Sequence, residues 1–529
     1  MFAGSASAAP QFPVRHSANH RHLVDAGGAP FPILGRTAWF VLSLAPADYR
    51  VFVDDTASRG FTSVELNVLN HDPRGNHPPF DGEGNRPFVN RVSGAPWDGA
   101  LTGYKTGGDA PDFTTPNEKY WRAVDVFLAY CESKNLLVFL FPAYVGFRGG
   151  DQGWMREMVA NGSARMRWYG AWVASRYRHQ RNLVWMIGGD MGTGLSPFDA
   201  RQTDVEEALV AGLQSVARES TQMSAEWSPE SIGTDQPSLG ASLTLNSVYS
   251  FNGDVAGLGR RAYARAAVEP SFLLEEPYDE EGPDGNRVNP AASQPVRRFV
   301  WEGWLSTIGG YIAGNGYVWP FRDGSWRGWL TDIRTALRSP GRHVPRRGPG
   351  WRDHLDTDGS RDLGRLNAFV TSIPWHTLVP SGLGGMRRLI TSDAEVVAAA
   401  SADGTLLVAY VPPGRRGSIA VDLRAMSGAA RARWLDPTSG GYASAGQEVP
   451  NSGAAQFVVP GPNGAGGSDW VLVIDRAAVT TPARDARERR PSWPTPSARP
   501  RRDDPVRRAS RRIPRRAASV RCAPRGSCR

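Results

Sequence analysis

The chain of 529 residues has little cysteine and no long hydrophobic run. Its three cysteines are Cys131, in the main part of the chain, and Cys522 and Cys528 near its end, so their spacing predicts neither a disulfide framework nor a paired-cysteine metal site. No apolar stretch approaches the roughly 18 to 20 residues that a membrane helix needs. We therefore expect a soluble protein with no membrane association and no disulfide scaffold.

Several catalytic and cofactor motifs are also missing. No G-x-G-x-x-G follows the first predicted strand, and neither a G-x-x-x-x-G-K-[ST] phosphate loop nor a G-x-S-x-G nucleophile elbow occurs. The nine histidines show no H-E-x-x-H pattern, and three of them fall in one segment, HSANHRH (16–22). The sequence thus gives no support to nucleotide-binding, serine-hydrolase or zinc-protease chemistry, and we predict that neither a metal nor a cofactor is required.

The net charge of +9 arises at the end of the chain. Residues 478–529 hold sixteen arginines against four acidic residues, which is +12, so the other 477 residues sum to −3. Because this tail is rich in proline and poor in apolar residues, it cannot bury enough surface to fold, and we predict that it is disordered. Its arginines lack interleaved stacking aromatics, so a solvated extension is favoured over a nucleic-acid or polyanion-binding arm.

The first residues leave the cellular compartment open. SASAAP is similar to the end of a secretion signal, but MFAGSASAAPQFP has neither a basic start nor an apolar core. We treat residues 1–20 as a flexible N-terminal segment. A secreted or periplasmic location stays open, and the oligomeric state is not indicated.

Strand-like runs alternate with helical patterns between residues 33 and 320. One helical pattern, NEKYWRAVDVFLAYCESKN, places Trp121, Val124, Phe127, Leu128 and Cys131 on one face. Eight strands are predicted, at 32–42, 61–70, 135–144, the apolar part of 182–192, 222–228, 243–251, 271–277 and 309–320.

This alternation predicts parallel strands joined by helical crossovers. Eight such units over about 300 residues fit a closed (β/α)8 TIM-type barrel, which we assign to residues 21–380. A doubly wound open sheet is the alternative. From about residue 385, short β runs with glycine turns predict a small antiparallel β-sandwich over residues 381–477, with Trp434 and Trp470 in its core.

Acidic residues follow two of the predicted strands directly. In NLVWMIGGDMG, Asp190 closes the fourth strand after two glycines, at the rim where barrel enzymes keep their chemistry. In SFLLEEPYDE, Glu275 and Glu276 end the seventh strand, and alternation predicts that one faces inward and the other outward. A carboxylate pair is what acid/base and nucleophilic attack on a glycosidic bond requires. Helix capping and surface ion pairing are the simpler alternatives.

Aromatic and amide side chains also stand at the predicted strand ends. Flat aromatic faces stack on the C–H surfaces of sugars, although barrel-core packing explains any single one of them equally well. The predicted substrate-binding residues are Trp39, Asn67, His71, Tyr144, Trp227, Tyr249 and Trp319.

Several ordered motifs resemble those of the apiosidase-like glycoside hydrolase family. They are HLVDAGGAPFPILGRTAWF, GFTSVELNVLN, NLVWMIGGDMG, LLEEPYDEEG, IPWHTLVPS and RARWLDPTSGG. The resemblance spans about residues 20–476 and implies a catalytic barrel followed by a small β domain that carries a collagen-binding label. It also implies that the aspartate of the G-G-D motif and the glutamate of an E-P-x-Y motif are catalytic. These are Asp190 and Glu276 here, which makes Glu275 the outward neighbour.

One position departs from the family pattern. The family usually has G-D-T-A-W at the first strand, whereas Arg36 here replaces the acid. We predict a glycoside hydrolase that cleaves complex, plant-type polysaccharide, by analogy pectic and apiose-containing, through a two-carboxylate and retaining mechanism. Its partner is then an oligosaccharide or polysaccharide. The alternatives are a non-catalytic carbohydrate-binding barrel, suggested by Arg36, and a polyanion-binding protein dominated by its tail.

Overall fold

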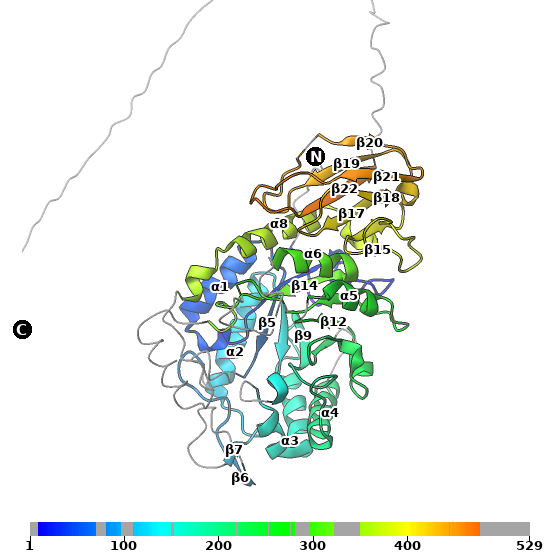
Figure 1. Cartoon of the computed structure of the whole chain (residues 1–529). Coiled ribbons are helices and arrows are strands. Elements are labelled where there is room, and N and C mark those ends of the chain that lie inside the picture. The colour runs from blue at the N-terminus through cyan, green and yellow to red at the C-terminus, as the bar shows by residue number, and fades with distance from the viewer. Residues whose placement is uncertain are drawn as a thin grey trace, which may run out of the picture. The chain divides into compact units, whose positions relative to one another are not determined.

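The fold is described from a computed structural model of the chain (Figure 1). The described residues are 9–69, 81–96, 109–149, 153–216, 221–251, 253–275, 277–280, 296–321, 350–443 and 445–476. The described part belongs to one compact unit that comprises residues 1–477. The predicted tail at 478–529 lies outside the described residues.

Eight parallel strands with helical crossovers form a TIM-type barrel, as predicted. Their order in the sheet is β10-β9-β8-β5-β4-β14-β13-β12, and the short β11 (Ser231–Ile232) adds antiparallel to β12. The bounds are β4 Ile33–Thr37, β5 Ser63–Asn67, β8 Leu137–Phe141, β9 Leu183–Gly188, β10 Gln222–Glu226, β12 Asn246–Tyr249, β13 Ser271–Leu273 and β14 Ile308–Ala313.

Side-chain hydroxyls join the two strands at which the barrel closes. Ser224 Oγ of β10 donates to the Leu245 carbonyl at 3.1 Å, and Ser247 Oγ of β12 donates to the Ala225 carbonyl. The backbone N–H of Leu245 also donates to the Met223 carbonyl at 3.1 Å. These bonds satisfy backbone groups that a complete strand ladder would otherwise pair.

Helices surround the barrel strands (Figure 1). Their bounds are α1 Pro46–Ser58, α2 Glu118–Ser133, α3 Met155–Arg176, α4 Ala200–Gln214, α5 Val255–Tyr263, α6 Val296–Thr307 and α8 Asp358–Ser372. All five residues predicted for the inner face of α2 are fully buried. Short 3-10 turns lie at Val41–Ser43, Phe147–Gly149, Gly233–Asp235, Gly240–Ser242, Trp351–His354, Trp375–Thr377 and Leu423–Ala425.

Polar residues begin several of these helices where the sequence changes from loop to apolar pattern. Asp199 caps α4 by accepting the Gln202 N–H at 2.9 Å, and the Asp199 N–H donates to Oε1 of Gln202 at 2.8 Å. Asn117 caps α2 in the simpler form, with its side chain accepting from the Lys119 N–H. Each cap satisfies an N–H that has no partner within its helix.

The N-terminal segment is packed where the structure describes it, contrary to the flexibility predicted for residues 1–20. The antiparallel strands β1 (Arg15–His16), β2 (Leu23–Val24) and β3 (Pro30–Phe31) form a small sheet. Phe12 and Val14 are buried in the main hydrophobic core. The prediction was wrong for residues 9–20, because Phe12 and Val14 pack on an apolar surface that exists only in the folded barrel.

Residues 378–476 form antiparallel sheets, as predicted for the second domain. One sheet has the order β15-β16-β17-β22-β19-β20, and β18 pairs with β21. A hydrophobic core includes Trp470, while the partly buried Trp434 packs against it. The strand bounds are β15 Leu378–Pro380, β16 Val397–Ser401, β17 Leu406–Val411, β18 Ser418–Asp422, β19 Ala430–Leu435, β20 Gln447–Val449, β21 Ala454–Val458 and β22 Trp470–Arg476.

Two further strands, β6 (Arg91–Pro96) and β7 (Asp109–Pro111), form a separate antiparallel pair. Among the helices that the structure describes, none combines the length and apolar character needed to cross a membrane.

A buried carboxyl group links α4 to the carboxyl end of β9. Glu206 has no exposed surface, and its Oε1 accepts from the Gly188 N–H at 2.9 Å. Burial raises the pKa of Glu206 to about 7. The folded protein therefore holds this proton more tightly than the unfolded chain does.

We predict that Glu206 makes the protein less stable as the pH rises. A carboxyl group whose pKa is raised on folding stabilises the folded state fully at a pH below its unfolded pKa near 4.5. This stabilisation is lost as the pH rises past its folded pKa of about 7. Glu206→Gln keeps the acceptor for Gly188 but cannot ionise. The unfolding free energy of Glu206→Gln minus that of wild type, measured by urea denaturation, should therefore rise by about 2 to 3 kcal/mol from pH 5 to pH 9.

The matched control is Glu207→Gln, which removes the same charge from the neighbouring, partly exposed position. Its unfolding free energy should follow wild type across this pH range. Equal pH dependence in Glu206→Gln and wild type would contradict the assignment.

Candidate active site

The candidate site begins with the turn that ends β9. Gly188, Gly189 and Asp190 have φ angles of 77°, 118° and 58°, so three consecutive residues adopt positive φ. Glycine is required at 189 because a Cβ there would lie 2.0 Å from Cδ2 of Tyr144. The G-G-D sequence therefore lets the chain turn against an aromatic ring and present the carboxylate.

Two tyrosines and one backbone contact hold Asp190 in place. Tyr144 Oη donates to Oδ2 of Asp190 at 2.5 Å, and Tyr249 Oη donates to Oδ1. The Asp190 N–H donates to Oε1 of Glu226 at 3.1 Å. With 8% of its surface exposed, Asp190 is almost enclosed by groups that orient it.

Glu275 supplies a second oriented carboxylate. Trp39 Nε1 donates to its Oε1 at 2.6 Å, and the Tyr278 hydroxyl donates to the same oxygen. The Trp39 ring lies 5.3 Å from that of Tyr144, between centroids, and Tyr144 bonds Asp190. Trp39 and Tyr144 therefore join the two carboxylates in one continuous set of contacts.

The expectation that Glu275 faces outward was wrong. Glu275 is 6% exposed and has a φ of 64°, so the left-handed backbone ends the in-and-out alternation on which the expectation rested. Glu276, the predicted catalytic glutamate, lies outside the described residues, and its role stays a prediction.

Two further carboxyl groups lie near this pair, and sequence reasoning missed both. Glu226 at the end of β10 and Glu65 in β5 have no exposed surface. Within the described part of the chain, Oε2 of Glu226 and both carboxyl oxygens of Glu65 have no hydrogen-bond partner. The sequence did contain a signal for them. Each glutamate lies inside or directly after a predicted strand, where a charged side chain would not be hydrated.

Burial and mutual repulsion determine which of these groups ionise. Burial raises the pKa of Glu226 well above its usual value, and the charges of Glu275, Asp190 and Glu65 raise it further. Burial and the charge of Asp190 likewise raise the pKa of Glu65. Glu226 and Glu65 therefore hold protons under conditions in which an exposed glutamate has lost its own.

The predicted substrate-binding residues separate into four groups, of which the enclosed Trp227 and Asn67 are the last. Trp39, Tyr144 and Tyr249 contact the carboxylates directly, as described above. Trp319 is half-buried, with its ring 6.2 Å from that of Tyr278. His71 lies outside the described residues.

Trp227 and Asn67 are enclosed by protein. Trp227 is 1% exposed, its Nε1 donates to the Gly233 carbonyl at 2.6 Å, and its ring lies beneath the glycines of the Asp190 turn. The structure thus gives Trp227 a packing role. Asn67 ends β5 with 1% exposure, and its Oδ1 has no partner among the residues that can be described.

Arg36 points away from the catalytic end. Its Nη1 donates to Oδ2 of Asp55 on α1 at 2.7 Å, and its guanidinium lies 5.2 Å from the Phe52 ring and 5.3 Å from the Phe61 ring. The departure from the family pattern therefore affects the packing between β4 and α1.

The described residues contain no cluster of three or more histidine, cysteine, aspartate or glutamate side chains arranged to hold a metal ion. The carboxyl groups of the site interact instead with tyrosine, tryptophan and backbone donors.

Comparison with known proteins shows which folds and families the chain is similar to. Two solved structures have similar folds. One is a glycoside hydrolase with 17% sequence identity and a TM-score of 0.66, and the match covers 88% of this chain and 97% of the other. The second is a glycoside hydrolase family 5 protein from Bacteroides vulgatus ATCC 8482 with 18% identity and a TM-score of 0.65, and the match covers 88% of this chain and 93% of the other. No curated protein sequence matches the chain.

Two family models match in succession along the chain. Residues 387–475 match a model described as "Putative collagen-binding domain of a collagenase". Residues 17–377, more than half of the chain, match the model of the apiosidase-like catalytic domain. The chain therefore belongs to the apiosidase-like family of glycoside hydrolases.

Proposed function

We propose that this glycoside hydrolase cleaves a plant-type, pectic polysaccharide, with apiose as the sugar that its family suggests. Asp190 and a glutamate at the end of β13 carry the reaction. The observation that supports this most is that Trp39 and Tyr144 connect the carboxylates of Asp190 and Glu275 at the carboxyl ends of their strands. Barrel enzymes place their chemistry at that end.

The proposed reaction retains the anomeric configuration. Asp190 gives its proton to the glycosidic oxygen as the bond to the anomeric carbon breaks, and the glutamate carboxylate attacks that carbon to form a glycosyl ester. Water then attacks the same carbon, gives its proton back to Asp190 and releases the glutamate. The donors Trp39 and Tyr278 suit Glu275 to the nucleophile's role, because they fix the orientation of its carboxyl group.

Two glutamates compete for the nucleophile's role. The family resemblance assigns it to Glu276, whereas the described contacts favour Glu275. The two residues are adjacent, so they can be tested as a pair in one background.

Glu226 has a positioning role in this scheme. Its carbonyl accepts the Gly189 N–H at 2.7 Å and its carboxyl group accepts the Asp190 N–H, so both ends of the residue hold the turn. Because Glu226 retains its proton, it adds no negative charge beside Asp190 when Asp190 must protonate the leaving group.

The non-catalytic carbohydrate-binding barrel is the second candidate, and it receives less support. It was suggested by Arg36, which packs against α1. A binding protein also has no need of two oriented carboxylates whose burial costs stability. Release of sugar from pectin fragments, identified by mass, separates the two candidates: binding without any released sugar would favour the second.

Our first catalytic prediction concerns Asp190. Asp190→Asn should lower kcat/KM by about 100-fold or more for substrates with poor leaving groups, because it cannot supply a proton. Aryl glycosides with activated leaving groups should be spared in part, since they depart without protonation. Full activity of Asp190→Asn on both substrate types would end the assignment.

A second prediction distinguishes the glutamates of β13. The nucleophile's glutamine variant should lose hydrolysis of both good and poor leaving groups, because no carboxylate remains to attack. We expect this of Glu275→Gln, with Glu276→Gln as the control of equal charge. The opposite result would assign the nucleophile to Glu276, and two fully active variants would contradict the mechanism. NMR of the first-formed anomer tests retention.

The third catalytic prediction concerns Glu226. Glu226→Gln mimics the protonated carboxyl group and can accept the Asp190 N–H, so kcat/KM should fall less than about tenfold. Glu226→Ala removes the acceptor, and we expect about a 100-fold loss with an intact circular dichroism spectrum. Equal losses in the two variants would show that the carboxyl group itself is needed.

A further inference from the structure

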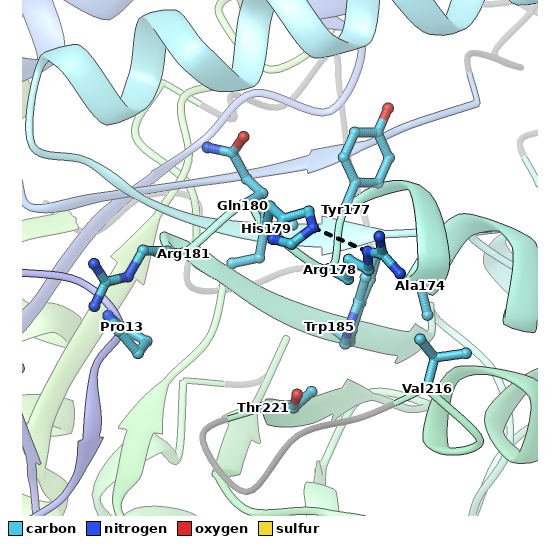
Figure 2. Close-up of a pocket in the computed structure, with 11 residues that line it drawn as sticks. Pro13, Ala174, Tyr177, Arg178, His179, Gln180, Arg181, Trp185, Val216 and Thr221 are labelled. Carbon is cyan, nitrogen blue, oxygen red and sulfur yellow. Dashed lines mark hydrogen bonds between the residues drawn. The ribbon is translucent and has the colours of Figure 1, made fainter.

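A hollow of about 380 Å³ lies at the amino ends of β9 and β10, opposite the catalytic end of these strands (Figure 2). It is bordered by Leu183, which begins β9, and by Thr221, which directly precedes β10. Four residues lie between Thr221 and Glu226 and six between Leu183 and Asp190, a distance of about 15 to 20 Å along the strands. The hollow is therefore a separate site from the catalytic carboxylates.

Basic side chains border the hollow on two sides, with Arg181 beside Pro13 and Arg178 near Ala174 (Figure 2). Arg178, His179 and Arg181 all come from the loop between α3 and β9, and all three are exposed. None of the lining residues is an aspartate or glutamate, and within the described ranges neither arginine forms an ion pair. This concentration of positive charge stands on a body whose net charge is −3.

One of these cations is oriented by its neighbour. Arg178 Nε donates to Nε2 of His179 at 3.0 Å, which leaves both terminal nitrogens of the guanidinium for another acceptor (Figure 2). Because His179 accepts at Nε2, its proton lies on Nδ1, where it is a further donor. A guanidinium held in this way loses less freedom when it binds a carboxylate.

Part of the lining of the hollow is apolar, and we call these residues its floor. Trp185 and Ala174 are each 6% exposed, and Leu183 and Val216 are half-buried beside them. In Figure 2, Arg178 lies above Trp185 and Arg181 extends beside Pro13. A small inorganic anion has no use for such a floor, whereas the C–H face of a sugar ring packs on it.

We infer that this hollow is a second saccharide site that binds a carboxylate-bearing sugar, with the carboxylate on Arg178, the ring over the apolar floor, and Arg181 adding positive charge at the opposite rim. The two terminal nitrogens of the Arg178 guanidinium are parallel donors that match the two oxygens of a carboxylate. The site would hold an acidic polysaccharide at the end of the barrel away from the catalytic residues. It needs no catalytic turnover, so it stands apart from the proposed function.

The test is calorimetric titration of the full chain with glucuronate, with glucose and inorganic phosphate as separate ligands. We expect glucuronate to bind, glucose to bind at least tenfold more weakly, and salt to weaken glucuronate binding. Binding of phosphate as tight as that of glucuronate would overturn the sugar-acid assignment, because it would show a general anion site.

Variants locate the binding. The double variant Arg178→Ala/Arg181→Ala should weaken glucuronate binding at least tenfold with an unchanged melting temperature, because both side chains are exposed. Arg167→Ala/Arg201→Ala removes two other exposed arginines and should bind as wild type does. Unchanged binding in the first double variant, or no glucuronate binding by wild type, would overturn the inference.

The lysine pair Arg178→Lys/Arg181→Lys keeps the charge and loses the paired donors. It should recover part of the affinity but stay weaker than wild type. Asp190→Asn should leave this titration unchanged, so failure of the catalytic proposal and failure of the second site would be seen in different measurements.

Discussion

The left-handed turn at residues 188–190 is the constraint on which the catalytic end of the barrel depends. A non-glycine residue in this conformation costs about 1 kcal/mol or more, and Asp190 adopts it at a φ of 58°. Three hydrogen bonds offset that cost: Gly188 donates to Glu206, Gly189 to the Glu226 carbonyl, and Asp190 to the Glu226 carboxyl group. The acids of α4 and β10 thus determine where the Asp190 carboxylate points.

Burial of several carboxyl groups is the second physical feature of the site. A buried charge without a partner is expensive, so such groups tend to keep their protons. Glu226 and Glu65 have raised pKa values for this reason, whereas Glu275 accepts hydrogen bonds from Trp39 and Tyr278 that favour its charged form. Burial and hydrogen-bond donors therefore act differently on carboxyl groups that lie close together in this site.

The β domain is bound to the barrel by buried charge and by stacked aromatic rings. Arg297 of α6 donates to both oxygens of Asp469 at 2.7 and 2.9 Å and also to Asp362 of α8. The Trp301 ring of α6 is stacked on Tyr410 of β17, with 6.0 Å between centroids and 1° between planes. One hydrophobic cluster therefore contains residues of α6 and β13 in the barrel together with residues of the β domain, which matches the second family model.

The sequence by itself determined the barrel, the β domain and the place of Asp190, because hydrophobic periodicity and a G-G-D turn are local properties. Only the tertiary structure decided that Glu275 faces inward, since a positive φ broke the alternation that sequence reasoning assumed. The enclosure of Trp227, the outward direction of Arg36 and the meeting of Glu65 and Glu226 with Asp190 also follow from contacts between distant strands. Periodicity along one strand carries no information about which side chains a neighbouring strand brings to it, and the chemistry of this site depends on those neighbours.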